Sequence, residues 1–366
     1  MVRKRTGGNV AEGAKSKKPT VHSQKAKPTN GSRNIILAVI FLIVFVLYVI
    51  IPLAVYYSPA VRRHAVFLNY ISLSREGNLS VPTESGLKCS RNLYIGSEDG
   101  LRLGAWHIPP LSKCKEDGSP SASDFNDGRP VFLYLHGNAG TRGGGHRVKL
   151  YKLLAEQVDA HVLAFDYRGF GDSSNVNPTE NGLVQDTNRV YDWLRKQHVD
   201  PSRILVWGHS LGTGVGVAFL NSLAESPSKP GALILEAPFT KIIEAAKYHP
   251  ISIFHRYMPF FETLIANPIG DEETGFDSIG RIHQVSCPLL ILHAEDDGFV
   301  PFEHGKILYE EALRHPKRKS LRPEDTQFVG FDGKFDLGHK NIYKSPDLPS
   351  IITKFIKNIG SKSKLV

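Results

Sequence analysis

The residues with the clearest chemical potential form the pentapeptide Gly208-His209-Ser210-Leu211-Gly212. It follows an apolar run at 204–207 and opens a helical pattern at 212–224. A Gly-x-Ser-x-Gly sequence between a strand and a helix is typical of a nucleophile elbow, a sharp turn that presents a serine hydroxyl at the carboxyl edge of a sheet. Ser210 is therefore the candidate nucleophile.

A serine hydroxyl reacts well only when a base takes its proton and a third group orients that base. In this arrangement the acid follows the serine along the chain and the base comes last. After the apolar run 288–292, the segment His-Ala-Glu-Asp-Asp-Gly-Phe-Val-Pro contains three carboxylates, Glu295, Asp296 and Asp297. The position just before the Val-Pro segment selects Asp297, and Asp296 is the alternative.

The base is expected after the last strand of the domain. His339 follows the strand-like run 327–331 and precedes an amphipathic helical pattern at 348–359. His304 and His315 come before that last strand, so we expect them to be surface residues. Order along the chain therefore selects His339 from the 15 histidines.

Acyl transfer also needs donors for the oxyanion of its transition state. The segment His136-Gly137-Asn138-Ala139-Gly140 directly follows the apolar run 131–135, where such donors belong. We expect the backbone N–H groups of Asn138 and Leu211 to form the oxyanion hole.

Short apolar runs that alternate with helical patterns must position these loops. The runs lie at 131–135, 161–165, 204–207, 232–235 and 288–292, with helical patterns at 181–198 and 212–224. Continuous apolar strands separated by helices predict a parallel, doubly wound sheet. Strand-like runs at 93–96 and 101–107 flank an Asp-Gly turn at 97–100 and predict a hairpin before it. The fold class is therefore α/β with a mostly parallel sheet.

The net charge of +9 is concentrated in a tail. Residues 1–33 hold nine Lys or Arg and one Glu, which leaves the rest of the chain almost neutral. No aromatic residue interrupts this basic tail, so we expect no nucleic-acid partner. Three Cys leave no four-Cys zinc site and no metal is expected. Cys89 and Cys114 could pair in an oxidising compartment, and Cys287 is expected to be a buried apolar residue.

Residues 35–57 carry no charge and would span roughly 35 Å as a helix, enough to cross a bilayer. The preceding basic tail places the N-terminus in the cytosol by the positive-inside rule. The remaining chain would then lie in the lumen or outside the cell. Asn78-Leu79-Ser80 is a glycosylation sequon on that side, so we predict a glycan on Asn78.

About fifty residues separate the strands near 236 and 288, and this insertion predicts a cap at about 239–285. Its aromatic cluster could line an acyl-chain cavity or touch the bilayer, and the candidate substrate-binding residues in it are Phe254, Tyr257, Phe260 and Phe261. Arg142, His146 and Arg147 follow the oxyanion segment and could meet an anionic head group.

Four of these motifs together resemble one family. Y-L-H-G-N-A-G-T-R-G-G, F-D-Y-R-G-F-G-D-S, W-G-H-S-L-G-T-G-V and L-L-I-L-H-A-E-D-D closely resemble the alpha/beta-hydrolase-domain lysophosphatidylserine lipases, also described as monoacylglycerol lipases. The resemblance implies a serine hydrolase of the endoplasmic reticulum membrane that faces the lumen, with Ser210, Asp297 and His339 as its triad. This chain departs from the family at Gly298-Phe299, where Pro-Val is expected.

The expected organisation is a basic tail at 1–33, a transmembrane helix at 34–57, a connector at 58–91 and an alpha/beta-hydrolase domain at 92–360. The expected activity is hydrolysis of lysophospholipids and monoacylglycerols without a cofactor, on a membrane-anchored enzyme whose oligomeric state stays open. A protein depalmitoylase or a peptidase would use the same triad. A non-catalytic membrane scaffold is the alternative outside enzymes, and the complete set of catalytic residues argues against it.

Overall fold

The computed structural model describes residues 30–71, 77–96, 100–115, 125–315, 318 and 321–360. Most of the predicted basic tail, the turn residues 97–99 and residues 116–124 of the loop after the hairpin lie outside this described part. The chain forms two compact units, Met1–Val46 and Leu47–Val366.

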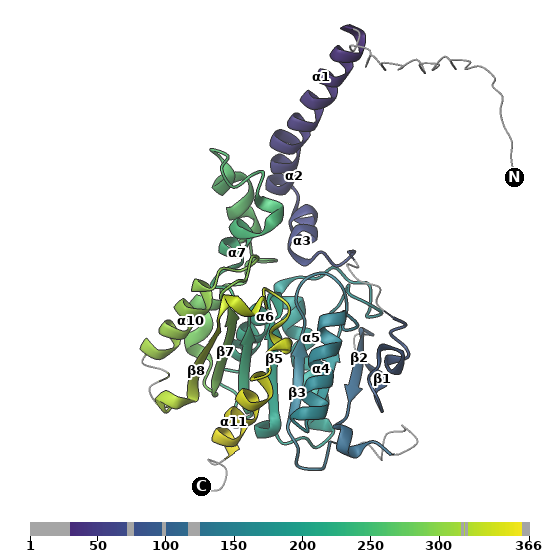
Figure 1. The fold of residues 1–366 in the computed structure, drawn as a ribbon, viewed down its shortest axis with the longest axis vertical. Helices are drawn as coiled ribbons and strands as arrows, with labels where there is room; N and C mark the ends of the chain where they lie inside the picture. The colour runs from purple at the N-terminus through teal and green to yellow at the C-terminus, as the bar shows by residue number, and fades with distance from the viewer. Residues whose placement is uncertain are drawn as a thin grey trace, which may run out of the picture. The chain divides into compact units, whose positions relative to one another are not determined.

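The N-terminal helical region is apolar and begins at α1 (Asn30–Phe45), followed by the π-helical turn η1 (Val46–Ile50) and α2 (Ile51–Tyr57) (Figure 1). Its helix over Gly31–Tyr57 is long and apolar enough to span a membrane. Large apolar side chains along it are exposed, as a lipid-facing helix requires.

The segment expected as a connector contains α3 (Pro59–Phe67) and the 3₁₀ turn η2 (Pro82–Ser85). Ser58 caps α3 by accepting a hydrogen bond from the backbone N–H of Val61. At the other end of α3 the Phe67 side chain is fully buried in the core. This segment is therefore packed onto the domain by its own apolar residues.

A single eight-stranded sheet forms the centre of the domain, in the order β1-β2-β4-β3-β5-β6-β7-β8. The pairs β1·β2 and β2·β4 are antiparallel and all later pairs are parallel. This confirms the predicted mostly parallel sheet with a preceding hairpin. The strands are β1 (Arg91–Gly96), β2 (Arg102–Ile108), β3 (Val131–Leu135), β4 (His161–Phe165), β5 (Ile204–His209), β6 (Ala232–Glu236), β7 (Leu289–Ala294) and β8 (Thr326–Phe331).

Helices cover both faces of the sheet, because alternate side chains of each parallel strand enter two different cores (Figure 1). One core contains residues of α5 (Glu180–Lys196), α6 (Leu211–Ser222) and α10 (Glu303–Arg314). The other contains residues of α4 (Gly145–Gln157) and α11 (Leu348–Gly360). Short 3₁₀ turns complete the domain: η3 (Leu111–Lys113), η4 (Pro201–Arg203), η9 (Pro323–Asp325), η10 (Gly333–Phe335) and η11 (Ile342–Lys344).

The long segment between β6 and β7 is built from short helices. They are α7 (Ile242–Tyr248), η5 (Pro250–Ser252), η6 (Glu262–Ala266), α8 (Asn267–Ile269), α9 (Ser278–Arg281) and η7 (Ile282–Gln284). Two ion pairs join α3 to this segment: Arg62 Nε lies 2.8 Å from Asp271 and Arg63 Nη1 lies 2.5 Å from Glu273.

The three cysteines comprise one disulfide pair and one free thiol. Cys89 and Cys114 form a disulfide, so the open possibility of their pairing is realised in the structure. Cys287 is a free, buried thiol at the start of β7, as predicted. The disulfide is of the kind found in proteins of oxidising compartments.

Candidate active site

The candidate nucleophile lies on a strained turn between β5 and α6. Ser210 has φ 52° and ψ −118°, which is unusual for a residue with a side chain. A Cβ atom at Gly208 would collide with the carbonyl of Gly212, and one at Gly212 would collide with the carbonyl of Leu135. The two glycines are therefore required where strand and helix pass each other.

Three residues from three different loops meet at this turn. The Ser210 hydroxyl lies 2.9 Å from Nε2 of His339, whose Nδ1 lies 2.7 Å from Oδ2 of Asp297. Asp297 follows β7 and His339 follows β8, so the parallel sheet brings both to the edge where β5 ends. Asp297 and His339 are buried, whereas Ser210 is partly exposed. This arrangement can pass a proton from a serine to a histidine held by a carboxylate.

The three competing carboxylates have different partners. Asp296 accepts a hydrogen bond from the N–H of Gly338, and Glu295 accepts one from the N–H of Gly333. Both therefore hold the loop that carries His339 and do not contact its ring. Asp297 also accepts backbone N–H bonds from Phe299 and Val300 through Oδ1. Burial alone would raise the pKa of Asp297, but hydrogen bonds from His293 and His339 outweigh it and the pKa lies well below its ordinary value.

His293 is a site residue that the sequence analysis missed. Its Nε2 lies 3.3 Å from Oδ2 of Asp297 and 3.0 Å from the carbonyl of Val300, and its side chain is fully buried. It therefore steadies the same carboxylate oxygen that orients His339. A histidine next to the last residue of an otherwise apolar strand, four residues before the acid, was the available signal.

The two predicted oxyanion donors have no competing backbone acceptor among the described residues. In the described part of the chain, the backbone N–H groups of Asn138 and Leu211 donate to no other group. Residues next to Asn138 are held by the end of α3 and the chain just after it: the N–H of Ala139 donates to the carbonyl of Phe67 and that of Gly140 donates to the carbonyl of Ile71. The segment that follows the apolar helix Gly31–Tyr57 thus holds the predicted oxyanion loop.

Arg147 holds this loop from the other side. Its guanidinium donates to the carbonyls of Gly137, Ala139 and Thr141, at 3.2, 2.9 and 2.5 Å. The side chain is 3% exposed, so it does not meet a head group as expected. Arg147 thus binds three carbonyls of the loop, while the N–H groups of Ala139 and Gly140 donate to Phe67 and Ile71, so Asn138 holds the loop N–H for which the described residues provide no backbone acceptor. The sequence places Arg147 near the loop but does not show which way its side chain points.

Arg142 likewise does not reach the substrate side. It is fully buried, and Nη1 lies 2.5 Å from Asp166 and 2.7 Å from Asp172. Burial raises the pKa of Asp166 to about 6 in spite of the guanidinium beside it. The expectation of a head-group contact is corrected for Arg142, because two carboxylates already bind its charge inside the protein.

Two further histidines surround the candidate base. His209 Nε2 donates to the backbone carbonyl of His339 at 2.8 Å, and the ring of His146 lies 5.5 Å from that of His209. Burial lowers the pKa of His146 to about 3, so the ring is neutral at pH 7 and brings no charge to an anionic head group. His304, expected at the surface, is buried and bonds to the Thr240 hydroxyl.

The aromatic residues of the cap separate into two groups. Phe254, Tyr257 and Phe260 are exposed, whereas Phe261 is buried in the core and does not face a ligand. The aromatic ring beside the base is Phe299, which stacks on His339 with ring centroids 5.2 Å apart. His249 contacts the other side of this pair, 5.5 Å from Phe299.

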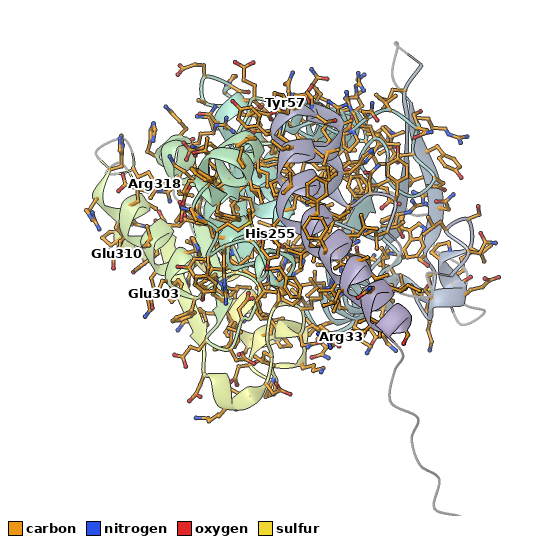
Figure 2. All side chains as sticks on the ribbon, turned by 90° about the horizontal axis from the view of Figure 1, so that it is seen from above. Arg33, Tyr57, His255, Glu303, Glu310 and Arg318 are labelled. Carbon is orange, nitrogen blue, oxygen red and sulfur yellow. A yellow bond between two sulfur atoms is a disulfide. The ribbon has the colours of Figure 1, made fainter. Side chains whose placement is uncertain are left out.

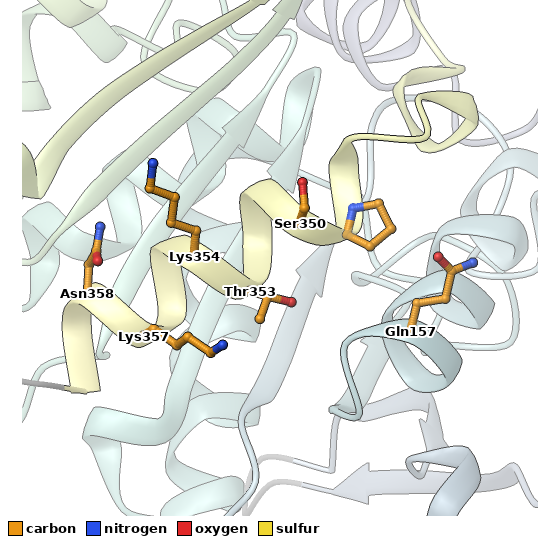
Figure 3. A pocket seen from close by; sticks show the side chains of 7 residues that line it. Gln157, Ser350, Thr353, Lys354, Lys357 and Asn358 are labelled. Carbon is orange, nitrogen blue, oxygen red and sulfur yellow. The ribbon is translucent and has the colours of Figure 1, made fainter.

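Two further features of the described chain bear on the assignment of the site. No group of three or more His, Cys, Asp or Glu residues among them could hold a metal ion. Figure 3 shows a surface hollow lined by residues of α11 and the end of α4, including Ser350, Lys354 and Gln157. It contains none of the three residues that meet at the nucleophile turn.

Solved structures of low sequence identity share the fold. An alpha-beta hydrolase from Vibrio vulnificus matches with a TM-score of 0.58 at 18% identity, covering 83% of this chain and 94% of that one. An esterase from Pyrococcus furiosus matches with a TM-score of 0.56 at 17% identity, covering 79% and 96%. A family profile for the alpha/beta hydrolase fold matches residues 130–249.

Relatives of higher identity extend over most of the chain. Lysophosphatidylserine lipase ABHD12 of Danio rerio is 42% identical over 315 residues, which cover 85% of this chain and 81% of that protein. The protein of the same name from Rattus norvegicus is 42% identical over 87% of this chain and 79% of its own length. Human protein ABHD12B is 37% identical over 72% of each. The chain therefore belongs to the ABHD12 family, and it is an alpha/beta hydrolase.

Proposed function

We propose that this hydrolase removes the acyl chain from lysophospholipids, lysophosphatidylserine among them, and from monoacylglycerols. The hydrogen-bonded series of Ser210, His339 and Asp297 is the observation that carries the proposal. The lipid class is supported by relatives named lysophosphatidylserine lipases and by the helix that could anchor the domain at a bilayer.

The first half of the reaction forms an acyl-enzyme. Ser210 Oγ attacks the ester carbonyl while His339 Nε2 takes the hydroxyl proton, and Asp297 stabilises the imidazolium through Nδ1–H. The negative carbonyl oxygen is bound by the N–H groups of Asn138 and Leu211. The ester C–O bond then breaks, and His339 returns its proton to the departing glycerol oxygen.

The second half releases the fatty acid. Water gives a proton to His339 and attacks the acyl carbonyl, and the same two N–H groups bind the new oxyanion. The bond to Ser210 Oγ breaks and the serine recovers its proton from His339. These steps need no cofactor, since the chain's own residues move every proton.

Lipids with one acyl chain are the favoured substrates. Each CH₂ withdrawn from an apolar environment costs about 0.8 kcal/mol, so a second long chain makes extraction from a bilayer much harder. The segment at about 239–285 is proposed as the cap that receives the single chain, and Phe299 lies where that chain would pass the base.

The proposed location is the endoplasmic reticulum membrane, with the basic tail in the cytosol and the hydrolase domain in the lumen. The positive charge before the apolar helix supports this orientation. The disulfide Cys89–Cys114 and the exposed side chain of Asn78 are consistent with an oxidising compartment in which glycans are added.

A fluorophosphonate probe tests the nucleophile and the substrate class together. The purified full-length protein should be labelled, Ser210→Ala should not, and lysophosphatidylserine should slow the labelling. An unlabelled wild-type protein would contradict the serine mechanism. Labelling that proceeds at the same rate with saturating lysolipid would indicate another ester or amide as substrate.

A further inference from the structure

The cap carries a group of large side chains that are mostly exposed. It consists of five large side chains that are 51–82% exposed: Tyr248, Ile253, Phe254, Tyr257 and Phe260. Such a cluster is unusual on a water-facing surface, and it generally marks a binding surface for another molecule or a membrane. We name these residues the aromatic tip of the cap.

One residue within the sequence range of the aromatic tip, His255, contacts the apolar helix. His255 Nε2 donates to the backbone carbonyl of Leu47 at 2.8 Å, and its ring lies 5.9 Å from that of Tyr48. Figure 2 labels His255 of the cap and Tyr57 at the end of α2. His255, which lies between Phe254 and Tyr257 of the tip in the chain, is therefore placed beside residues 47 and 48.

The length of the apolar helix indicates whether Leu47 and Tyr48 are surrounded by lipid or by water. Only thirteen residues separate Arg33 from Leu47, and as a helix they span about 20 Å. A hydrocarbon core of about 30 Å needs about 20 residues, so a span that starts after Arg33 ends near Leu53. Leu47 then lies about 9 Å inside that boundary. The side chains beside it must share its surroundings.

We infer that the aromatic tip of the cap is immersed in the leaflet next to the hydrolase domain, so that lipid substrates enter the site directly from the bilayer. The inference rests on the proposed membrane anchoring of the helix Gly31–Tyr57. Aromatic side chains are favoured at this depth because one part of each ring system is apolar and the tyrosine hydroxyls can reach the interface.

Continuity between the tip and the base supports direct entry. Tyr248 of the tip precedes His249, whose ring contacts Phe299, and Phe299 stacks on His339. Two ring contacts thus lead from the residue that follows Tyr248 in the chain to the candidate base. The ion pairs of Arg62 and Arg63 with Asp271 and Glu273 hold the cap against the end of the anchor.

Quenching by brominated lipids measures this immersion in the full-length protein. Phe254→Trp and Tyr257→Trp each add a fluorophore at the tip, and both positions are exposed enough to accept it. Leu111→Trp, in η3 next to the amino-terminal end of β4, is the control outside the membrane, and Phe41→Trp is the control within it. The proteins are reconstituted in phosphatidylcholine vesicles with dibrominated acyl chains or with ordinary chains.

Both tip variants should lose most of their added emission in brominated vesicles, as Phe41→Trp does, while Leu111→Trp keeps its emission. Tip variants that are quenched no more than Leu111→Trp, with Phe41→Trp quenched, would overturn the inference. An unquenched Phe41→Trp would overturn it together with the anchor. The measurement does not depend on hydrolysis, so a failure of the proposed activity is detected separately.

Discussion

At the scale of single residues, the site depends on which carboxylate reaches His339. Asp297 and Asp296 are adjacent in sequence, yet one bonds to the imidazole and the other to the backbone of Gly338. The two neighbouring side chains point in different directions. Asp297 therefore orients His339, whereas Asp296 holds the backbone of the loop that carries it.

Asp297→Asn should lower kcat by about 10⁴-fold and leave the fold intact, because an amide no longer holds the productive imidazole tautomer. Asp296→Asn is the matched control and should lose much less activity, since an amide oxygen still accepts the bond from Gly338. Steady-state rates on one lysophospholipid compare the two. A larger loss in Asp296→Asn would show that the acid has been misassigned.

Glu236 predicts a dependence of stability on pH. Burial raises its pKa from an ordinary value of 4.5 to about 7. The folded state therefore binds a proton that the unfolded state releases, and stability falls as pH rises from about 4.5 to about 7. The loss above this window is up to about 3 kcal/mol.

Glu236→Gln removes this dependence and keeps an acceptor for the indole N–H of Trp207. The variant should gain stability over the wild type between pH 5 and pH 8, measured by thermal unfolding in detergent. A difference between the two proteins that is the same at both pH values would rule out a raised pKa at Glu236.

At the scale of elements, the predicted oxyanion loop is held by residues whose contacts with it cannot be predicted from the sequence pattern. The end of α3 and the chain just after it bind the loop through the carbonyls of Phe67 and Ile71, and Arg147 of α4 binds its carbonyls. The loop therefore stays in position before any substrate arrives.

Arg147→Lys should lower kcat by about 10²-fold with little change in KM. The lysine ammonium lacks the planar fork with which Arg147 binds several carbonyls, so the N–H donors of the loop would no longer be held in position for the oxyanion. Arg189→Lys, on α5, is a control for the same substitution in another helix. A higher KM with an unchanged kcat would indicate that Arg147 contacts the head group and does not position the loop.

The elements themselves were largely predictable. The runs at 131–135 and 161–165 match β3 and β4, and the pattern at 348–359 matches α11 to within one residue. Buried parallel strands are continuously apolar, so their bounds are visible in sequence. The pattern did not reveal α3 in the expected connector, because a helix of 9 residues is too short to repeat an amphipathic period clearly.

The sequence predicted which residues form the candidate triad, but it did not predict the direction of the side chains around them. Chain order and strand ends brought Ser210, Asp297 and His339 together as expected, since parallel strands deliver their loops to one edge. Arg142 and Phe261 were misjudged because residue type does not show whether a side chain points into the core. His293 lies in the core beside Asp297, a proximity that only the fold creates.

At the scale of the whole molecule, membrane orientation remains a prediction from charge. Endoglycosidase treatment should shift the mobility of the wild-type protein and leave Asn78→Gln unchanged, since Asn78 is exposed on the proposed lumenal side. A tag on the N-terminus should be digested by protease added to sealed microsomes. Protection of that tag would reverse the orientation.

The central claim is that Ser210 hydrolyses lipids with one acyl chain, and the most direct measurement compares matched esters. Purified full-length protein in detergent is assayed for fatty-acid release from lysophosphatidylserine, a monoacylglycerol and diacyl phosphatidylserine with the same acyl chain. We predict turnover of the first two well above that of the third, and none in Ser210→Ala. Equal rates on one-chain and two-chain esters, or activity that survives in Ser210→Ala, would contradict the account.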